Sequence, residues 1–176
     1  MVKTDLILDF VNTLDLRPYS EAFETPAQLG AWLEDRGLLA GGARVTKRDL
    51  EEAKSVREAL RDLMSVQNGL AADVAAANAA IDDASCRAEY MLRFKDGSGR
   101  LEATAPGVRG ALGRILADVS AAMADGTWPR LKACRAEDCR WAFLDTAKNR
   151  SRAWCSMESC GNRAKVQAYR ERHLHH

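Results

Sequence analysis

The sequence predicts a mainly α-helical protein with a small β-hairpin, in which a helical amino-terminal domain precedes a carboxyl-terminal four-cysteine module made of a hairpin and a helix. Three observations support this fold class. Apolar residues recur at helical spacing in several segments, one segment alternates apolar and polar residues, and four of the five cysteines lie between positions 134 and 160. The 176 residues are 47% hydrophobic and 29% charged, which is typical of a folded globular chain.

The first two helices are expected before residue 40. The first is predicted from five apolar residues at helical spacing: Leu6, Ile7, Phe10, Val11 and Leu14. The second has Thr25 as its amino-terminal cap, Pro26 at its first position and Gln28 to complete a capping box. Gly37 follows as a stop signal, so we expect this helix to end just before it.

Three further helices complete the predicted scaffold. A long helix is expected to begin at Thr46 and end near Gly69, with Glu and Arg or Lys pairs on its outer face. The alanine-rich segment 71–84 favours another helix. The last runs from about Pro106 to Asp125, with one apolar stripe formed by Val108, Leu112, Ile115, Val119 and Met123.

A hairpin is predicted over residues 88–104. Tyr90, Leu92 and Phe94 alternate with polar residues, and the turn chemistry follows at 96–99. Gly126 and Pro129 then break the helical pattern. We therefore expect a helical domain at 1–130, acting as a scaffold or a ligand sensor, and a second domain at 131–176.

The second domain contains two Cys-x4-Cys pairs, Cys134 with Cys139 and Cys155 with Cys160. Such pairs can each supply two thiolates to a tetrahedral Zn²⁺, and four protein ligands indicate structural rather than catalytic zinc. Disulfides, a thiol redox pair and coincidence are the alternatives. Disulfides are disfavoured because the acidic residues in the first apolar stretch argue against a secretory signal, which predicts a cytoplasmic protein. Cys86 is expected to be a small buried apolar residue.

Between the cysteine pairs, the aromatic segments 140–145 and 151–155 flank a polar turn, so a hairpin clasped by zinc is expected there. After Cys160 the composition favours a helix that begins near this cysteine. Residues 131–176 contain ten Lys and Arg against five Asp and Glu, whereas the preceding 130 residues contain 16 against 20. This basic charge suits a phosphate backbone, and a solvated basic surface is the alternative.

From the charge alone, double-stranded DNA is a candidate partner on an equal footing with the solvated surface. The candidate contacts are Lys148, Arg150, Arg152, Asn162, Arg163, Lys165, Gln167 and Arg170. Asn162 and Arg163 have a structural alternative, in which they hydrogen-bond the zinc site or pair with Asp145. A homodimer is a further expectation, because one small module binds DNA weakly.

The amino-terminal domain offers one candidate ligand pocket, formed by Phe10, Asn12 and Trp32. The alternative places the aromatic rings in the core and Asn12 in a buried hydrogen bond. An enzyme is not expected, because all three histidines lie in the last four residues. Two other functions stay open: a protein-interaction adaptor that presents Trp141 and Trp154, and a domain that senses a small-molecule effector.

Two groups of motifs resemble a known family. "CGNR" at 160–163, preceded by the spaced cysteines, is similar to the bacterial CGNR zinc finger. "LDFVNTLDLR" at 8–17 and "ETPAQLGAWLEDRGLL" at 24–39 resemble the ABATE domain, which precedes that finger in stress-induced transcription regulators. The resemblance implies DNA binding, a role in stress response, and Cys134, Cys139, Cys155 and Cys160 as the zinc ligands.

Overall fold

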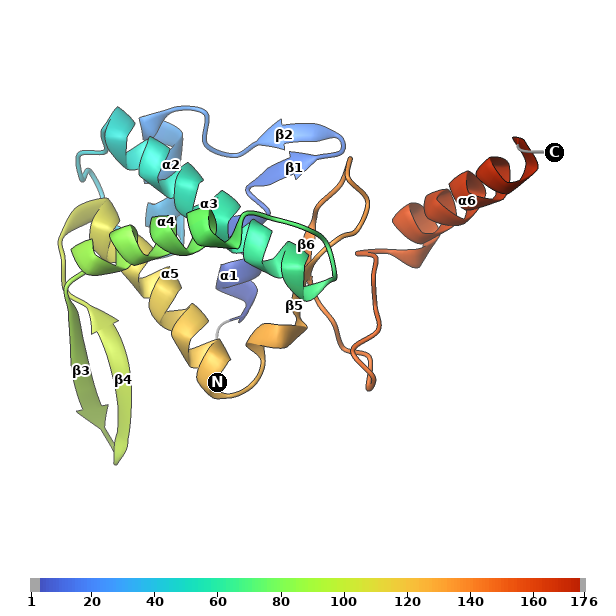
Figure 1. The fold of residues 1–176 in the computed structure, drawn as a ribbon. Coiled ribbons are helices and arrows are strands. Elements are labelled where there is room, and N and C mark those ends of the chain that lie inside the picture. The colour runs from blue at the N-terminus through green and yellow to red at the C-terminus, as the bar shows by residue number, and fades with distance from the viewer. Residues whose placement is uncertain (1–3, 175–176) are drawn as a thin grey trace.

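The predicted fold class is confirmed by the computed structural model, which describes residues 4–174 (Figure 1). The α-helices are α1 Thr4–Val11, α2 Pro26–Asp35, α3 Lys47–Gln67, α4 Val74–Arg87, α5 Gly107–Ala124 and α6 Asn162–Leu174. Each antiparallel sheet is one pair of strands: β1 Leu14–Leu16 with β2 Tyr19–Glu21, β3 Tyr90–Lys95 with β4 Ser98–Ala103, and β5 Leu131–Ala133 with β6 Ala142–Leu144. Short helical turns occur at η1 Trp128–Arg130 and η2 Met157–Gly161. Within the described chain, no helix has the length and apolarity that a membrane span requires.

The ends of α2 and α3 follow their sequence signals. Thr25 and Gln28 form the expected capping box of α2, and Gly37 takes a φ of +64° just after that helix. Thr46 caps α3 in the same way, with Asp49 as its partner. These local hydrogen bonds satisfy amide groups that have no partner inside the helix, and therefore fix where each helix begins.

The core lies between α1, α3 and α5. Their fully buried side chains include Ile7, Phe10, Leu60, Met64, Leu112 and Ile115. Two residues of the predicted apolar helix stripes, Leu14 and Met123, lie elsewhere than expected. α1 ends at Val11, and Thr13 donates its hydroxyl to the Phe10 carbonyl, so the chain turns and Leu14 begins β1. Met123 lies 51% exposed, because the apolar stripe of α5 meets the core only as far as Val119 and Ala122.

Small residues allow α4, β4 and α5 to approach closely. A Cβ atom added at Gly113 of α5 would lie 2.5 Å from the Cβ of Ala88 and 2.6 Å from that of Ala103. The alanine-rich α4 therefore contributes close packing rather than large side chains, with Ala77 and Ala84 buried.

The β3–β4 hairpin packs on α5 only at its base. Tyr90 donates its hydroxyl to the Gly113 carbonyl at 3.1 Å. Further along the same face, Leu92 pairs with Leu101 and Phe94 with Gly99, yet Leu92 is 55% and Phe94 74% exposed. The tip of the hairpin projects from the body (Figure 1). The exposed fractions of Leu92 and Phe94 show that its apolar face is uncovered.

The outer face of α3 differs from its prediction, since Arg57 and Arg61 are buried. Arg57 donates to both carboxylate oxygens of Glu21, at 2.7 and 3.0 Å. Arg61 is 0% exposed and donates to the carbonyls of Val11, Leu14 and Arg140. The reason is that β1–β2 and the loop at Arg140 cover this face and bring carbonyls that no strand pairs. Buried carbonyls need donors, and Arg61 supplies them.

The β5–β6 hairpin packs on α3 and enters the same core. Leu131, Ala133 and Ala142 are buried in one cluster with residues of the helical body. The core therefore continues past residue 130.

Arg61 should be far more important for stability than exposed arginines of the same helix. We expect Arg61→Met to lower the free energy of unfolding by about 3 kcal/mol, because it removes the donor from one buried and two part-buried carbonyls. Arg48→Met, at the exposed start of α3, should change it by less than about 0.5 kcal/mol. Urea unfolding of the zinc-loaded chain measures both, and equal values would contradict the role of Arg61.

Candidate metal centre and basic surface

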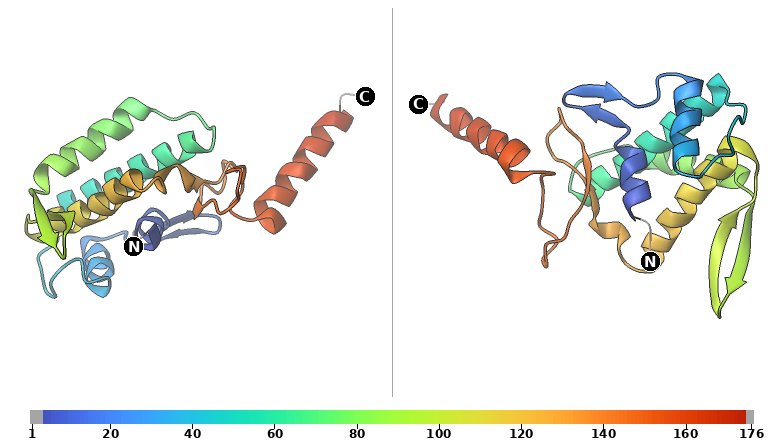
Figure 2. Two further views of the ribbon diagram at one scale, coloured as in Figure 1. Left: turned by 90° about the horizontal axis from the view of Figure 1, so that it is seen from below. Right: turned by 180° about the vertical axis from the view of Figure 1, so that it is seen from behind.

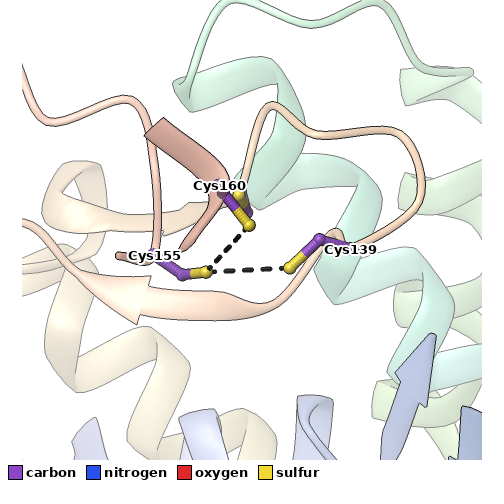
Figure 3. A group of neighbouring side chains, drawn as sticks. Cys139, Cys155 and Cys160 are labelled. Atoms are coloured by element: carbon purple, nitrogen blue, oxygen red, sulfur yellow. Dashed lines mark hydrogen bonds between the residues drawn. The ribbon is translucent and has the colours of Figure 1, made fainter. Parts of the chain in front are cut away.

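The four cysteines of the carboxyl-terminal region meet at one point. Cys134 follows β5, Cys139 precedes β6, Cys155 lies in the segment after β6, and Cys160 lies in η2. Their Sγ atoms all lie within 4.8 Å of one another. Cys155 Sγ is 3.7 Å from Cys139 Sγ and 3.7 Å from Cys160 Sγ (Figure 3).

These separations fit a tetrahedral metal ion. With metal–sulfur bonds of ~2.3 Å, sulfurs at the corners of a tetrahedron are ~3.8 Å apart, close to the observed 3.7 Å. The sulfur–sulfur bond of a disulfide is ~2.05 Å, and all five cysteines are free. Four soft ligands in this arrangement suit Zn²⁺, whose four positions would then all be filled by protein. Cys86 lies exposed in α4, so its predicted burial is wrong.

The sulfur cluster on its own accommodates little negative charge. A hydrogen bond from Cys139 lowers the pKa of Cys134 to about 5, and backbone amides contribute in the same direction. Burial, followed by the charge on Cys134, raises the pKa of Cys155 to about 12. The hydrogen bond to Cys134 likewise raises the pKa of Cys139. One thiolate thus opposes the ionisation of the neighbouring thiols, and a bound cation would be required to ionise all four cysteines.

Arg163, the last residue of the "CGNR" segment, contacts the cysteine site. Its Nη2 lies 3.3 Å from Cys160 Sγ and 3.2 Å from an Asp138 carboxylate oxygen. The structural alternative for Arg163 is therefore confirmed for the cysteine contact. Its acidic partner, however, is Asp138 and not Asp145.

Asp145 instead forms a buried ion pair with Lys132 of β5. Its Oδ2 lies 2.7 Å from Lys132 Nζ and also accepts the Arg152 amide at 3.0 Å. Burial alone raises the pKa of the Asp145 carboxyl, but the bonds to Lys132 and to two amides outweigh burial and lower this pKa. Lys132 also donates to the carbonyls of Arg150 and Arg152.

This ion pair explains why the predicted strand pairing is wrong. Segment 151–155 was expected to pair with the strand after Cys139, but β6 pairs with β5. The polar backbone groups around Arg152 bond to Lys132 and Asp145 rather than to a neighbouring strand.

Three polar side chains of the helical body hold the backbone of the cysteine module. Asn12 exchanges two hydrogen bonds with the backbone of Ala142, at 2.9 and 2.8 Å. Asn68 donates to the carbonyls of Ala133 and Ala153, and Arg61 donates to that of Arg140. These contacts link the sequence-distant parts of the chain through directed bonds as well as through apolar packing.

The candidate ligand-pocket residues do not line one cavity. Phe10 is fully buried and packs against Trp32, with ring centroids 5.8 Å apart, and both rings also contact Phe23. Asn12 points to Ala142 instead. The alternative, core packing with a hydrogen-bonded Asn12, is the arrangement observed.

Trp141 and Trp154 are half-buried against the cysteines, in a small second cluster with Phe143. A Cβ atom added at Gly161 would lie 2.8 Å from Met157 Sδ and 3.4 Å from Trp154. The two tryptophans therefore pack around the cysteine site while part of each side chain stays exposed.

The candidate nucleic-acid contacts lie in two places, the loop after β6 and α6, and Arg152 differs from the others. Lys148 and Arg150 are exposed on the loop after β6. Asn162, Lys165, Gln167 and Arg170 are exposed on α6, and Arg163 begins that helix half-buried. Arg152 is the exception, because it lies over the Phe143 ring at 4.8 Å and donates to the Trp154 and Cys155 carbonyls.

α6 projects from the body as a single helix. All three views show it extending into solvent, with only its amino-terminal end meeting the rest of the chain (Figures 1 and 2). Its main packing partner is η2, the turn that holds Cys160. Four cations and one acid lie on it: Arg163, Lys165, Arg170, Arg172 and Glu171.

One residue beside this helix was not singled out from the sequence. Arg17, in the turn between β1 and β2, pairs with Asp138 at 2.5 Å, and Asp138 also pairs with Arg163. A shallow groove lies between Arg17 and α6, lined also by Ser159, Asn162 and Arg170. No local pattern indicates this position, because it depends on how β1–β2 docks beside the cysteine module.

Comparison with known families gives two matches. A family model named ABATE, described as "Putative stress-induced transcription regulator", matches residues 4–127. A model of the CGNR zinc finger matches residues 130–173. A search of curated proteins gave no match. The two families occur in the order that the sequence motifs indicated.

The metal site yields a stoichiometric prediction. The purified chain should contain one zinc ion per molecule by elemental analysis, and Cys155→Ser should lose most of it, because three thiolates bind more weakly than four. Cys86→Ser, which removes the exposed cysteine of α4, should keep one zinc. Retention of full zinc by Cys155→Ser would refute the proposed ligand set.

The Lys132–Asp145 pair yields a stability prediction. Asp145→Asn should destabilise the zinc-loaded chain by about 3 kcal/mol at neutral pH, because it leaves a buried ammonium without its counter-ion. Glu137→Gln removes an exposed carboxylate nearby and should cost less than about 0.5 kcal/mol. Denaturant titration followed by tryptophan fluorescence compares them. A variant of Asp145 as stable as that of Glu137 would show that the ion pair is dispensable.

Proposed function

The chain belongs to the ABATE family and carries a CGNR zinc finger, and on this premise we propose that it is a bacterial, cytoplasmic, zinc-dependent DNA-binding transcription regulator that acts in stress response. The zinc would be structural, because four cysteines leave no ligand position open for substrate or water. No catalytic role is proposed for any residue.

The observation that carries this proposal is the projecting helix α6. A helix of 13 residues is marginal in water without tertiary contacts, and α6 has its main contacts only at its first turn. α6 carries four cations and one acid, and its exposed large apolar side chains are Val166 and Tyr169. The excess of cations suits an anionic partner, and the major groove of duplex DNA admits an α-helix.

The residues of α6 divide naturally between phosphates and bases. Lys165 and Arg170 are exposed cations that suit phosphate contact, together with Lys148 and Arg150 on the neighbouring loop. Gln167 could bond adenine in the major groove, once released from its 3.0 Å bond to Glu171. Arg152 is assigned to holding the loop instead, because its guanidinium bonds internal carbonyls.

A second candidate function is suggested by the β3–β4 hairpin. Its uncovered apolar face, with Leu92, Phe94 and Leu101, is typical of a surface that binds another protein. The hairpin and α6 lie at opposite ends of the molecule (Figure 1). A protein partner bound there would leave α6 free for DNA. A homodimer formed through these hairpins would hold its two α6 helices far apart, so we expect any homodimer to form elsewhere.

Binding to duplex DNA tests the proposal. Fluorescence anisotropy with a random duplex should show binding at low salt, and the logarithm of the association constant should fall linearly with the logarithm of salt concentration. Selection from a random duplex pool then identifies any preferred sequence. An intact, zinc-loaded chain that binds no duplex at low salt would refute the proposal.

A truncated chain that ends at Gly161 provides the matched comparison, since it retains all four cysteines and removes α6. We expect it to keep its zinc and its melting temperature within a few degrees and to lose at least tenfold in DNA affinity. Undiminished affinity would exclude α6 as the binding element.

A further inference from the structure

The ion pair between Arg17 and Asp138 joins the regions of this chain that match the two family models. Arg17 comes from the β1–β2 turn of the ABATE region, whereas Asp138 and Arg163 come from the zinc finger. The side chains of Arg17 and Arg163 are 56% and 32% exposed, and both line the groove beside α6. Residues separated by about 120 positions in sequence thus form one small basic group.

Two guanidinium groups converge on one carboxylate oxygen. Arg17 Nη1 lies 2.5 Å and Arg163 Nη1 lies 3.1 Å from Asp138 Oδ2. Arginine is suited to phosphate because its planar group presents parallel donors to an anion, and clustered arginines therefore commonly bind phosphate. Asp138 accordingly occupies the position that a phosphate oxygen would take between them.

The hydrogen bonding of this group is incomplete. Arg163 Nη1 is buried and makes no hydrogen bond within the described chain, although it lies 3.1 Å from Asp138. A buried donor without a suitably directed acceptor is unfavourable. A tetrahedral anion has oxygens pointing in more directions than a carboxylate and could satisfy donors that Asp138 does not.

The surroundings include further donors and some acids. The Asn162 side chain and the Ser159 hydroxyl line the same groove, and Arg170 lies further along it. Glu158 lines the groove too, and Asp15 accepts the Arg17 amide at 2.7 Å. A bound phosphate would therefore displace Asp138 from the arginines rather than add to a purely basic site.

We propose that Arg17, together with Arg163, binds a backbone phosphate of DNA, and that Asp138 competes with this phosphate for the two arginines. This inference rests on the proposed function and extends its binding surface from the zinc finger to the ABATE region. The finger alone then presents an incomplete site. Because Asp138 repels the phosphate, it limits the affinity of the protein for DNA of any sequence.

The first test compares two arginines of the ABATE region in the full-length, zinc-loaded protein. Arg17→Ala should raise the Kd for duplex DNA about five- to tenfold and reduce the salt slope by about 1, as expected for one lost phosphate contact. Arg48→Ala is the matched control, because Arg48 is exposed about 30 Å along α3 from the helix end that contacts the finger. It should change the Kd less than twofold.

The second test compares two neighbouring acids of equal charge. Asp138→Asn should lower the Kd at least threefold, because it frees both arginines. Glu137→Gln should change it less than twofold, because within the described chain neither arginine pairs with Glu137. Zinc content and the melting temperature are measured for both variants, so that a disturbed cysteine site is not mistaken for a change in binding.

The outcomes separate this inference from the function on which it rests. If the wild-type chain binds no duplex, both are refuted. If it binds but Arg17→Ala behaves as Arg48→Ala does, or Asp138→Asn as Glu137→Gln does, only the phosphate contact is refuted. Addition of inorganic phosphate at matched ionic strength tests whether the two arginines bind a free phosphate ion instead of a DNA phosphate. Thermal stabilisation by phosphate that depends on Arg17, with unchanged DNA affinity of Arg17→Ala, would assign the site to a small phosphate and overturn the inference.

Discussion

The hydrogen bonds from Asn12, Arg61 and Asn68 to the cysteine-bearing backbone are the interactions on which the rest of this structure depends. The cysteine module is too small to bury much apolar surface by itself, and its strands β5 and β6 have three residues each. Asn12 holds Ala142, Arg61 holds Arg140, and Asn68 holds Ala133 and Ala153. These backbone groups lie within three residues of Cys134, Cys139 or Cys155 in the sequence. The helical body therefore helps to position these three cysteines relative to one another.

The same docking gives the two family regions one shared surface. Since β1 and β2 lie beside the module that Arg61 and Asn12 hold, Arg17 reaches Asp138, which also pairs with Arg163. A zinc finger attached through a free linker would not place an arginine of the preceding domain at a fixed position. The ABATE region is in this respect part of the proposed DNA-binding surface as well as its support. The uncovered apolar face of the β3–β4 hairpin lies at the other end of the molecule and stays separate from it.

The sequence predicted what depends on neighbours along the chain. Thr25, Gln28 and Gly37 bounded α2 correctly, and the spacing of the cysteines indicated the metal site. The errors at Arg61 and at segment 151–155 share one physical origin, which is contact between distant segments. Arg61 is buried because β1–β2 and the loop at Arg140 cover α3. The segment 151–155 forms no strand, because Lys132 and Asp145 hydrogen-bond the backbone around Arg152. Neither arrangement has a local pattern, because charged residues on a helix normally indicate a solvated face.

The attachment of α6 through η2 has a consequence for how the metal would act. The helix is joined to the body at one end only, and the turn that joins it contains Cys160. When the turn η2 is fixed, it also fixes the direction in which α6 projects from the body. When the turn η2 is flexible, α6 samples many directions relative to the body. Each binding event then costs the conformational entropy of orienting α6. A bound metal ion that fixes η2 would thus raise the effective concentration of α6 at its partner, while the residues that make contact stay the same.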